Sequence, residues 1–130
     1  MAAMQHIGFN CSDMKASEAF YTKHFGFRRA RVFNAGQSGE FIMLRTGSMC
    51  LELFQSGDTA ARGGDQTVGF KHLAFEVPDL EKALAALHAD GVTTGPIHDC
   101  AWVTPGMRVC FFQDRDGNTL ELMEGWKDQF

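Results

Sequence analysis

His72-Leu73-Ala74-Phe75-Glu76 decides the fold of this chain, because a related stretch, His6-Ile7-Gly8-Phe9-Asn10, stands near its beginning. Each half of the chain also ends on one tripeptide, Leu51-Glu52-Leu53 in the first and Leu120-Glu121-Leu122 in the second. The two stretches are nearly as many residues apart in the sequence as the two tripeptides are. A self-similarity with a nearly constant offset indicates an internal repeat. The sequence therefore predicts two modules of about 60 residues each.

Both repeated stretches alternate apolar and polar residues, as a half-buried strand requires, and the periodicity then becomes helical. In the second module we expect a helix that Asp79 caps and Gly91 ends. In the first module either Ser12 or Asp13 can cap the helix, and Gly26 ends it. The apolar stripes of the two helices are expected at Leu80, Ala83, Leu84 and Leu87 and, less regularly, at Ala16, Ala19, Phe20 and Tyr21.

Three strand-like runs follow each helix. They are expected at about 27–35, 40–46 and 49–55 in the first module and at about 92–99, 107–114 and 119–124 in the second. Each module is then βαβββ, and the fold class is α+β. We expect a single domain over residues 1–130, with module 1 at 1–55, a polar linker at 56–67 and module 2 at 68–130.

Composition excludes several classes of protein. The 130 residues carry a net charge of −4 without a basic stripe, so nucleic acid is a poor partner. The N-terminal residues lack the pattern of a signal peptide, and no apolar run is long enough to cross a membrane. The four cysteines show no C-x-x-C pairing and are expected to be reduced thiols. We therefore expect a cytoplasmic protein that does not act at a membrane.

Two histidines and two glutamates occupy matching positions in the repeat: His6 and Glu52 in the first module, His72 and Glu121 in the second. Each glutamate lies between two leucines and thus on the opposite face of its strand. That face also carries Cys50 and Phe54 in one module and Thr119 and Met123 in the other. A carboxylate in an apolar wall is costly unless it has a partner. Two imidazoles and two carboxylates suit a divalent Ni, Co, Zn, Fe or Mn ion, although a single strand histidine is more often an ordinary structural residue.

These residues resemble the vicinal oxygen chelate superfamily, which includes glyoxalase I. The resemblance covers nearly the whole chain. It rests on five phrases in order: His6-Ile7-Gly8-Phe9, the helix phrase from Phe20 to Phe27, Leu51-Glu52-Leu53, Gly69 to Phe75, and Phe111 to Leu122. The last contains Asp114-Arg115-Asp116-Gly117-Asn118, in which Arg115 replaces the proline that the family usually has.

Membership would imply two βαβββ modules that form an incomplete barrel around one divalent metal ion, with His6, Glu52, His72 and Glu121 as the ligands. Ni, Co and Zn are the expected ions, and Fe or Mn are alternatives. In short members of the family the barrel forms across a homodimer, so the sites lie at the interface. The metal-free antibiotic-binding members, which resemble bleomycin-resistance proteins, generally lack these ligands.

The resemblance further implies a lyase or isomerase of the glyoxalase I type. Its substrate would be a small oxoaldehyde–thiol adduct, with glutathione as a possible thiol, and the reaction would pass through an enediolate. Glu121 is the expected base, and Glu52 can serve the opposite face of the substrate. Arg31 aligns with an arginine that contacts the glutathione carboxylate in glyoxalase I, and Trp102 lies in a loop, 97–107, that could cover the pocket.

Two other classes of function stay open. One is a different metal-dependent enzyme of the same superfamily, namely an epimerase, a thiol transferase or a dioxygenase. The other is a non-catalytic protein that binds a small molecule. The transferases and dioxygenases usually keep only two histidines and one glutamate, so Glu52 argues against them.

Overall fold

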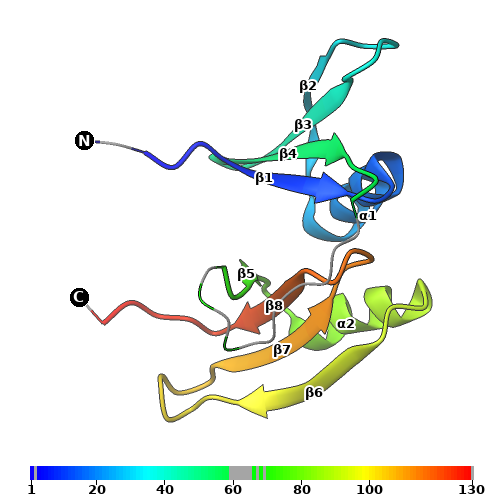
Figure 1. The fold of residues 1–130 in the computed structure, drawn as a ribbon. Helices are drawn as coiled ribbons and strands as arrows, with labels where there is room; N and C mark the ends of the chain where they lie inside the picture. The colour runs from blue at the N-terminus through cyan, green and yellow to red at the C-terminus, as the bar shows by residue number, and fades with distance from the viewer. Residues whose placement is uncertain (2, 59–65, 67, 69, 130) are drawn as a thin grey trace. The chain divides into compact units, whose positions relative to one another are not determined.

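The computed structural model describes residues 1, 3–58, 66, 68 and 70–129. The chain divides into two compact units, Met1–Ala61 and Arg62–Phe130, whose elements are labelled in Figure 1. Most of the linker predicted at 56–67 lies outside the described residues. No helix in the described part of the chain is long and apolar enough to span a membrane.

The first unit is one sheet with one helix. Its elements are β1 (His6–Cys11), α1 (Met14–Phe25), β2 (Arg28–Phe33), β3 (Phe41–Thr46) and β4 (Met49–Gln55). The strand order is β1-β4-β3-β2, in which β1 runs parallel to β4 and the other neighbours are antiparallel.

The second unit repeats this arrangement. Its elements are β5 (Leu73–Glu76), α2 (Leu80–Ala89), β6 (Thr94–Asp99), β7 (Arg108–Gln113) and β8 (Thr119–Glu124). The strand order β5-β8-β7-β6 has the same parallel and antiparallel pairs as the first sheet. The predicted α+β class with two βαβββ modules is therefore confirmed, and in the described part of the chain neither four-stranded sheet closes into a barrel.

The predicted helix ends are also correct. The carboxylate of Asp13 accepts a hydrogen bond from the amide of Ala16, and that of Asp79 accepts one from the amide of Lys82, each at 3.0 Å. Asp13 is thus the cap that the first helix uses. Gly26 ends this helix with φ +69°, a left-handed conformation in which glycine avoids the steric cost of a Cβ atom.

The apolar stripe predicted for α1 was partly wrong. The buried residues of this helix are Met14, Ser17 and Tyr21, whereas Ala19 is exposed. Positions 14, 17 and 21 follow the i, i+3, i+7 spacing of one helix face. The stripe of α2 is as expected, with Leu80, Leu84 and Leu87 buried.

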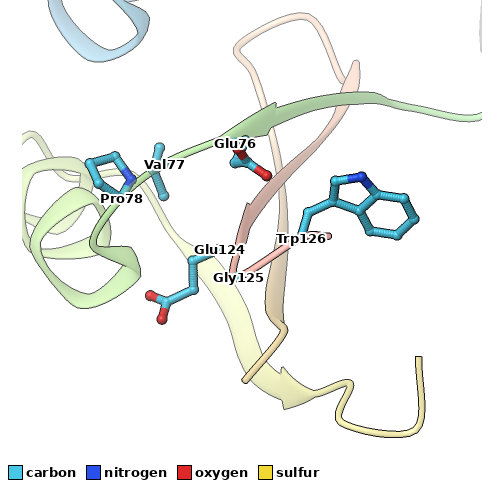
Figure 2. Close-up of a pocket in the computed structure, with 6 residues that line it drawn as sticks. All are labelled: Glu76, Val77, Pro78, Glu124, Gly125 and Trp126. Carbon is cyan, nitrogen blue, oxygen red and sulfur yellow. The ribbon is translucent and has the colours of Figure 1, made fainter. Parts of the chain in front are cut away.

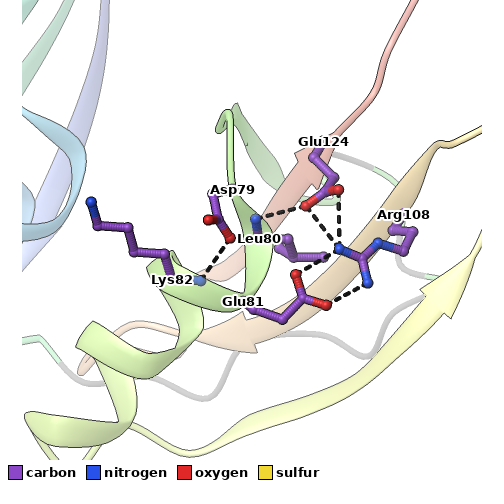
Figure 3. Close-up of polar contacts among 6 residues, drawn as sticks. All are labelled: Asp79, Leu80, Glu81, Lys82, Arg108 and Glu124. Atoms are coloured by element: carbon purple, nitrogen blue, oxygen red, sulfur yellow. Dashed lines mark hydrogen bonds and ion pairs between the residues drawn. The ribbon is translucent and has the colours of Figure 1, made fainter.

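A side chain at the end of each last strand holds the start of each helix. Gln55, at the end of β4, accepts a hydrogen bond from the amide of Met14 at 2.9 Å. Glu124, at the end of β8, accepts one from the amide of Leu80 at 2.7 Å. These bonds satisfy helix amides that have no partner within the helix. In the second unit Arg108 extends the network, because its guanidinium binds both Glu124 and Glu81 (Figure 3).

The two faces of each sheet differ. The face toward the helix carries the core, which in the first unit includes Ile42, Leu44, Leu51 and Leu53, all at most 2% exposed. Burial of each such side chain contributes about 1.5–3 kcal/mol relative to exposure. The residues that alternate with these core residues point to the other face of the sheet, which the helix leaves open. They include the histidines and glutamates of the repeat.

One glycine brings the end of β8 against a neighbouring loop. Gly125 has φ +77°, and a Cβ atom on it would overlap the backbone oxygen of Gly106. Gly117 has a similar φ, +78°, in the turn before β8, but a Cβ atom there would meet open space. Gly125 is thus required by both its conformation and its surroundings, and Gly117 by its conformation alone.

Candidate functional site

The first site pair joins β1 to β4. His6 Nε2 lies 2.8 Å from Glu52 Oε2, and the two side chains are 44% and 16% exposed. The parallel register explains the contact, because Glu52 lies opposite Gly8 and His6 is two residues earlier on the same face of its strand. His6 Nδ1 also contacts Gln5 Oε1, an oxygen that can only accept. A proton on Nδ1 satisfies this contact, and a neutral imidazole with that proton would present the Nε2 lone pair to a metal ion if the ion replaced the direct contact of Nε2 with Glu52.

The second pair repeats this geometry on the other sheet. His72 Nε2 lies 2.9 Å from Glu121 Oε2, with side chains 29% and 11% exposed. His72 was predicted within the first strand of the module but stands one residue before β5, which begins at Leu73. Its ring lies 5.5 Å, between centroids, from that of Phe111 on β7. Each glutamate of the repeat therefore has a histidine of its own module as partner, which the sequence alone did not reveal.

The donor set fits a divalent ion. When two ligand atoms each lie about 2.1 Å from a metal ion and the angle between them at the ion is 90°, the two atoms lie about 3.0 Å apart. The histidine nitrogen and glutamate oxygen of each pair have nearly that separation, so little movement would be needed for both to bind one ion. Among the described residues no group of three or more His, Cys, Asp or Glu side chains could hold a metal. Each module taken by itself thus offers two ligands.

The two predicted substrate contacts lie in different units. Arg31 is exposed on β2 and pairs with Met43, which in turn pairs with Glu52, so these side chains share the open face of the first sheet. The guanidinium carbon of Arg31 lies 5.7 Å from the centroid of the Phe33 ring. Trp102, in the loop between β6 and β7, is 85% exposed. Among the described residues no hydrogen bond or ring contact joins Trp102 to His72 or Glu121.

Three phenylalanines lie beside the first pair, of which only Phe54 was predicted on this face from the sequence. Phe33 stacks on Phe41 with ring centroids 4.2 Å apart, and Phe41 stacks on Phe54 at 4.8 Å. They are paired across β2, β3 and β4, on the same face as Glu52. The alternation within each predicted strand contained the signal, but the register that aligns the rings required the structure.

A cavity in the second unit is lined by none of the predicted site residues. It has a volume of about 400 Å³ and lies at the ends of β5 and β8 (Figure 2). Its lining residues are Glu76, Val77, Pro78, Glu124, Gly125 and Trp126. Glu124 is already engaged by Arg108 and the start of α2, so this part of the unit has a structural role.

Electrostatic shifts in the second unit also belong to structural groups. Hydrogen bonds from Arg108 lower the pKa of Glu81, and the two carboxylates Glu81 and Glu124 raise the pKa of Arg108. Burial raises the pKa of the Cys110 thiol. All four cysteines are free, and all except Cys100 are buried, as expected for reduced thiols.

The repeated βαβββ modules and the duplicated His–Glu pair define a class of protein, and comparison with known proteins gives the same class. Residues 3–122 match the model of the Glyoxalase/Bleomycin resistance protein/Dioxygenase superfamily. The chain belongs to this family, which confirms the resemblance that its motifs carry.

Particular relatives can be named. The uncharacterized protein YwkD of Bacillus subtilis is 35% identical over 127 residues, which cover 95% of this chain and 98% of that protein. A crystal structure of a glyoxalase family protein from Enterococcus faecalis has a TM-score of 0.76 and 33% identity, with 94% of this chain and 97% of that one covered.

Two solved structures with lower identity share the fold. One is a lactoylglutathione lyase from Agrobacterium tumefaciens, with a TM-score of 0.66, 22% identity and coverage of 96% of this chain and 95% of that one. The other is the fosfomycin resistance protein FosX from Listeria monocytogenes, in complex with Mn(II) and sulfate. It has a TM-score of 0.73, 18% identity and coverage of 97% of this chain and 94% of that one.

Proposed function

We propose that this chain is a metal-dependent lyase or isomerase of the glyoxalase I type. Its substrate would be a small oxoaldehyde–thiol adduct in which a proton moves between adjacent carbons. The observation that carries the proposal is the duplicated pair, a histidine nitrogen 2.8–2.9 Å from a glutamate oxygen on the open face of each sheet. Fold neighbours described as a lactoylglutathione lyase and as a complex with Mn(II) support it.

The proposed ligands are His6, Glu52, His72 and Glu121, and Ni, Co or Zn is the proposed ion, with Fe or Mn as alternatives. A divalent ion in this site would supply stabilisation of the negative charge that develops on two vicinal oxygens of the substrate. The site would join both modules, either of one chain or of two chains in a homodimer. We further propose that the protein acts in the cytoplasm.

The glutamates would move the proton. Glu121 is the proposed base: it takes the proton from the carbon next to the carbonyl and returns it to the neighbouring carbon as an acid. Its side chain is the less exposed of the two, 11% against 16% for Glu52, so bulk water competes less for the proton it holds. Glu52 would serve the opposite face of the substrate. Without metal, His6 and His72 hold these carboxylates in place through their Nε2 contacts, and in the metal-loaded protein the same Nε2 atoms would bind the ion instead.

Substrate recognition would fall to groups around the pairs. Arg31 shares the open face with Glu52 and is a proposed contact for a carboxylate of the thiol, for which glutathione is the candidate. Trp102, with its largely exposed ring, is a proposed contact from the loop between β6 and β7.

The test is metal analysis followed by turnover. Protein reconstituted with Ni, Co or Zn should convert the methylglyoxal–glutathione adduct to a thioester, measured by absorbance. Glu121→Gln should lower kcat by about 100-fold or more because it removes the base. Glu76→Gln is the matched control, since Glu76 is an exposed glutamate on β5 that contacts neither histidine in the described structure.

Two results would contradict the proposal. A metal-loaded protein without turnover of any oxoaldehyde–thiol adduct would favour another enzyme of the superfamily or a binding protein. Turnover that survives Glu121→Gln unchanged would remove Glu121 as the base while leaving the enzyme class intact.

A further inference from the structure

Four arginines lie on β2 and β3, and one of them has a carboxylate partner. Arg29 lies opposite the buried Leu44, and thus on the helix face of the sheet, where its guanidinium binds Glu18 of α1. Among the described residues no carboxylate forms an ion pair with the other three, which lie on the open face: Arg28, Arg31 and Arg45. One face therefore gathers three positive charges in a chain whose net charge is −4.

The strand register sets two of these arginines directly opposite each other. Arg28 on β2 pairs with Arg45 on β3. Like charges that lie opposite each other on neighbouring strands repel and lower stability. Arg45 is partly buried, so less water screens its charge from that of Arg28. A bound anion would remove this repulsion.

A β-bulge brings the third arginine to the same face. Residues three positions apart in a regular strand point to opposite faces, but the register of β2 shifts between Arg29 and Arg31. Arg31 therefore lies on the open face with Arg28. Its guanidinium lies near the Phe33 ring, on the side away from Arg28. Arg28 and Arg45 thus form a pair, and Arg31 is a separate contact beside it.

The second module has neutral residues at the positions that match this pair. Gln113 takes the place of Arg45, because each lies two residues after the residue of its strand that pairs with the glutamate of the repeat. Strand β6 has the same kind of register shift as β2, and counting from it Thr93 takes the place of Arg28. The module therefore folds without positive charge here, and the fold itself does not require the arginine pair.

The arginine pair lies in one row with the histidine of the first site pair. Across β1, β4, β3 and β2 this row consists of His6, Cys50, Arg45 and Arg28. Neighbouring strands are about 4.8 Å apart, so the backbone at Arg45 is roughly 10 Å from that at His6. A substrate whose oxygens are held at His6 and Glu52 would therefore extend toward the arginines on the same face.

We propose that Arg28 and Arg45 bind a phosphate group, and that the substrate carries this group at the end remote from its vicinal oxygens. A phosphate monoester has a charge of about −1.5 to −2 at neutral pH and three acceptor oxygens, so it can accept hydrogen bonds from both guanidinium groups at once. A carboxylate has one charge and two oxygens, which a single guanidinium already satisfies. The assignment of the phosphate to the substrate rests on the proposed function, whereas the phosphate site itself requires no metal.

Binding of inorganic phosphate to the metal-free full chain tests the site. Metal is removed with a chelator, which is then dialysed away, and the dissociation constant is measured by phosphorus NMR at constant ionic strength. Arg28→Gln and Arg45→Gln should each weaken binding by about tenfold or more, because each removes charged hydrogen-bond donors. Arg29→Gln is the matched control, since it removes the same charge from the helix face, and it should leave the dissociation constant unchanged.

Several results would overturn the phosphate site. They are absence of phosphate binding, binding that Arg28→Gln and Arg45→Gln leave unchanged, and an equal loss in Arg29→Gln. Acetate bound as tightly as phosphate would overturn it too, because the site would then be one for a carboxylate. A change of oligomeric state in Arg45→Gln without a change in phosphate affinity would show instead that the arginines face a second copy of the chain.

Two thiols that differ by a phosphate test its assignment to the substrate. Methylglyoxal adducts of 2-mercaptoethyl phosphate and of 2-mercaptoethanol would be compared on metal-loaded protein. We expect kcat/KM to be about tenfold higher for the phosphate adduct, mainly through KM, and this preference to disappear in Arg45→Gln but persist in Arg29→Gln. Equal kcat/KM values for the two adducts in the unaltered protein would overturn the assignment. Turnover of neither these adducts nor that of glutathione would contradict the proposed function, while phosphate binding to the metal-free protein would still support the site.

Discussion

Replacement of His72 should show how much the second His–Glu pair contributes to the free energy of unfolding. In the variant His72→Ala the carboxylate of Glu121 loses its partner at 2.9 Å while its side chain stays only 11% exposed. A buried group that loses its hydrogen-bond partner costs about 1–3 kcal/mol, so we expect the free energy of unfolding to fall by that amount. His6→Ala should act similarly, because the side chain of Glu52 is also only 16% exposed.

The measurement is urea unfolding followed by circular dichroism at neutral pH, with a chelator present so that bound metal does not contribute. Two variants bracket the result. Glu121→Gln keeps an acceptor for His72 and should cost less than about 1 kcal/mol. His98→Ala removes an exposed histidine of the same sheet and should change stability by no more than about 0.5 kcal/mol. A His72→Ala protein no less stable than His98→Ala would refute a stabilising contact between His72 and Glu121.

Three further predictions concern the structural groups. Hydrogen bonds from Arg108 hold the pKa of Glu81 below its usual 4.5, so this pair stabilises the fold above that pH and the contribution disappears as pH falls through the lowered pKa. Wild type and Glu81→Gln should therefore differ in urea midpoint at pH 7 and converge in acid, and a constant difference would contradict the pairing. Gly125→Ala should cost at least about 2 kcal/mol in thermal unfolding and Gly117→Ala only about 1–2 kcal/mol, because only the former adds steric overlap to a positive φ. Equal losses would refute that difference. Iodoacetamide should modify Cys100 before the three buried cysteines, as peptide mass spectrometry can show, and early labelling of a buried thiol would contradict the burial.

Local chemistry explains why the sequence predicted the elements well. Asp13 and Asp79 act on amides three residues away, and the glycine after α1 acts on its own backbone, so both signals are visible in a short window. The alternation along β1 and β4 likewise placed His6 and Glu52 on the faces where they lie. The offset of the repeat added what a single module would not have shown, namely that the second module has the same elements in the same order.

Patterns within a short stretch of sequence do not predict contacts between strands that are far apart in the chain. The direct approach of His6 to Glu52 depends on the parallel register of β1 and β4, which the sequence does not contain in any short window. The same holds for Gln55 and Glu124, whose roles at the helix starts depend on where a strand ends relative to a helix. Each follows the glutamate of its repeated tripeptide by the same interval, which was the available signal. Their side chains differ, however, so the repeat did not mark them as equivalent.

The most direct test of the proposed metal centre is the stoichiometry and affinity of metal binding to the full chain, measured by competition with a chelator of known affinity. If His6, Glu52, His72 and Glu121 form one shared site, the protein binds one divalent ion per chain. Then His6→Ala and His72→Ala each weaken that single site by about 100-fold. Two ions per chain, with each variant losing one of them, would show that the pairs act separately. Binding that survives both replacements unchanged would contradict a metal site at these residues altogether.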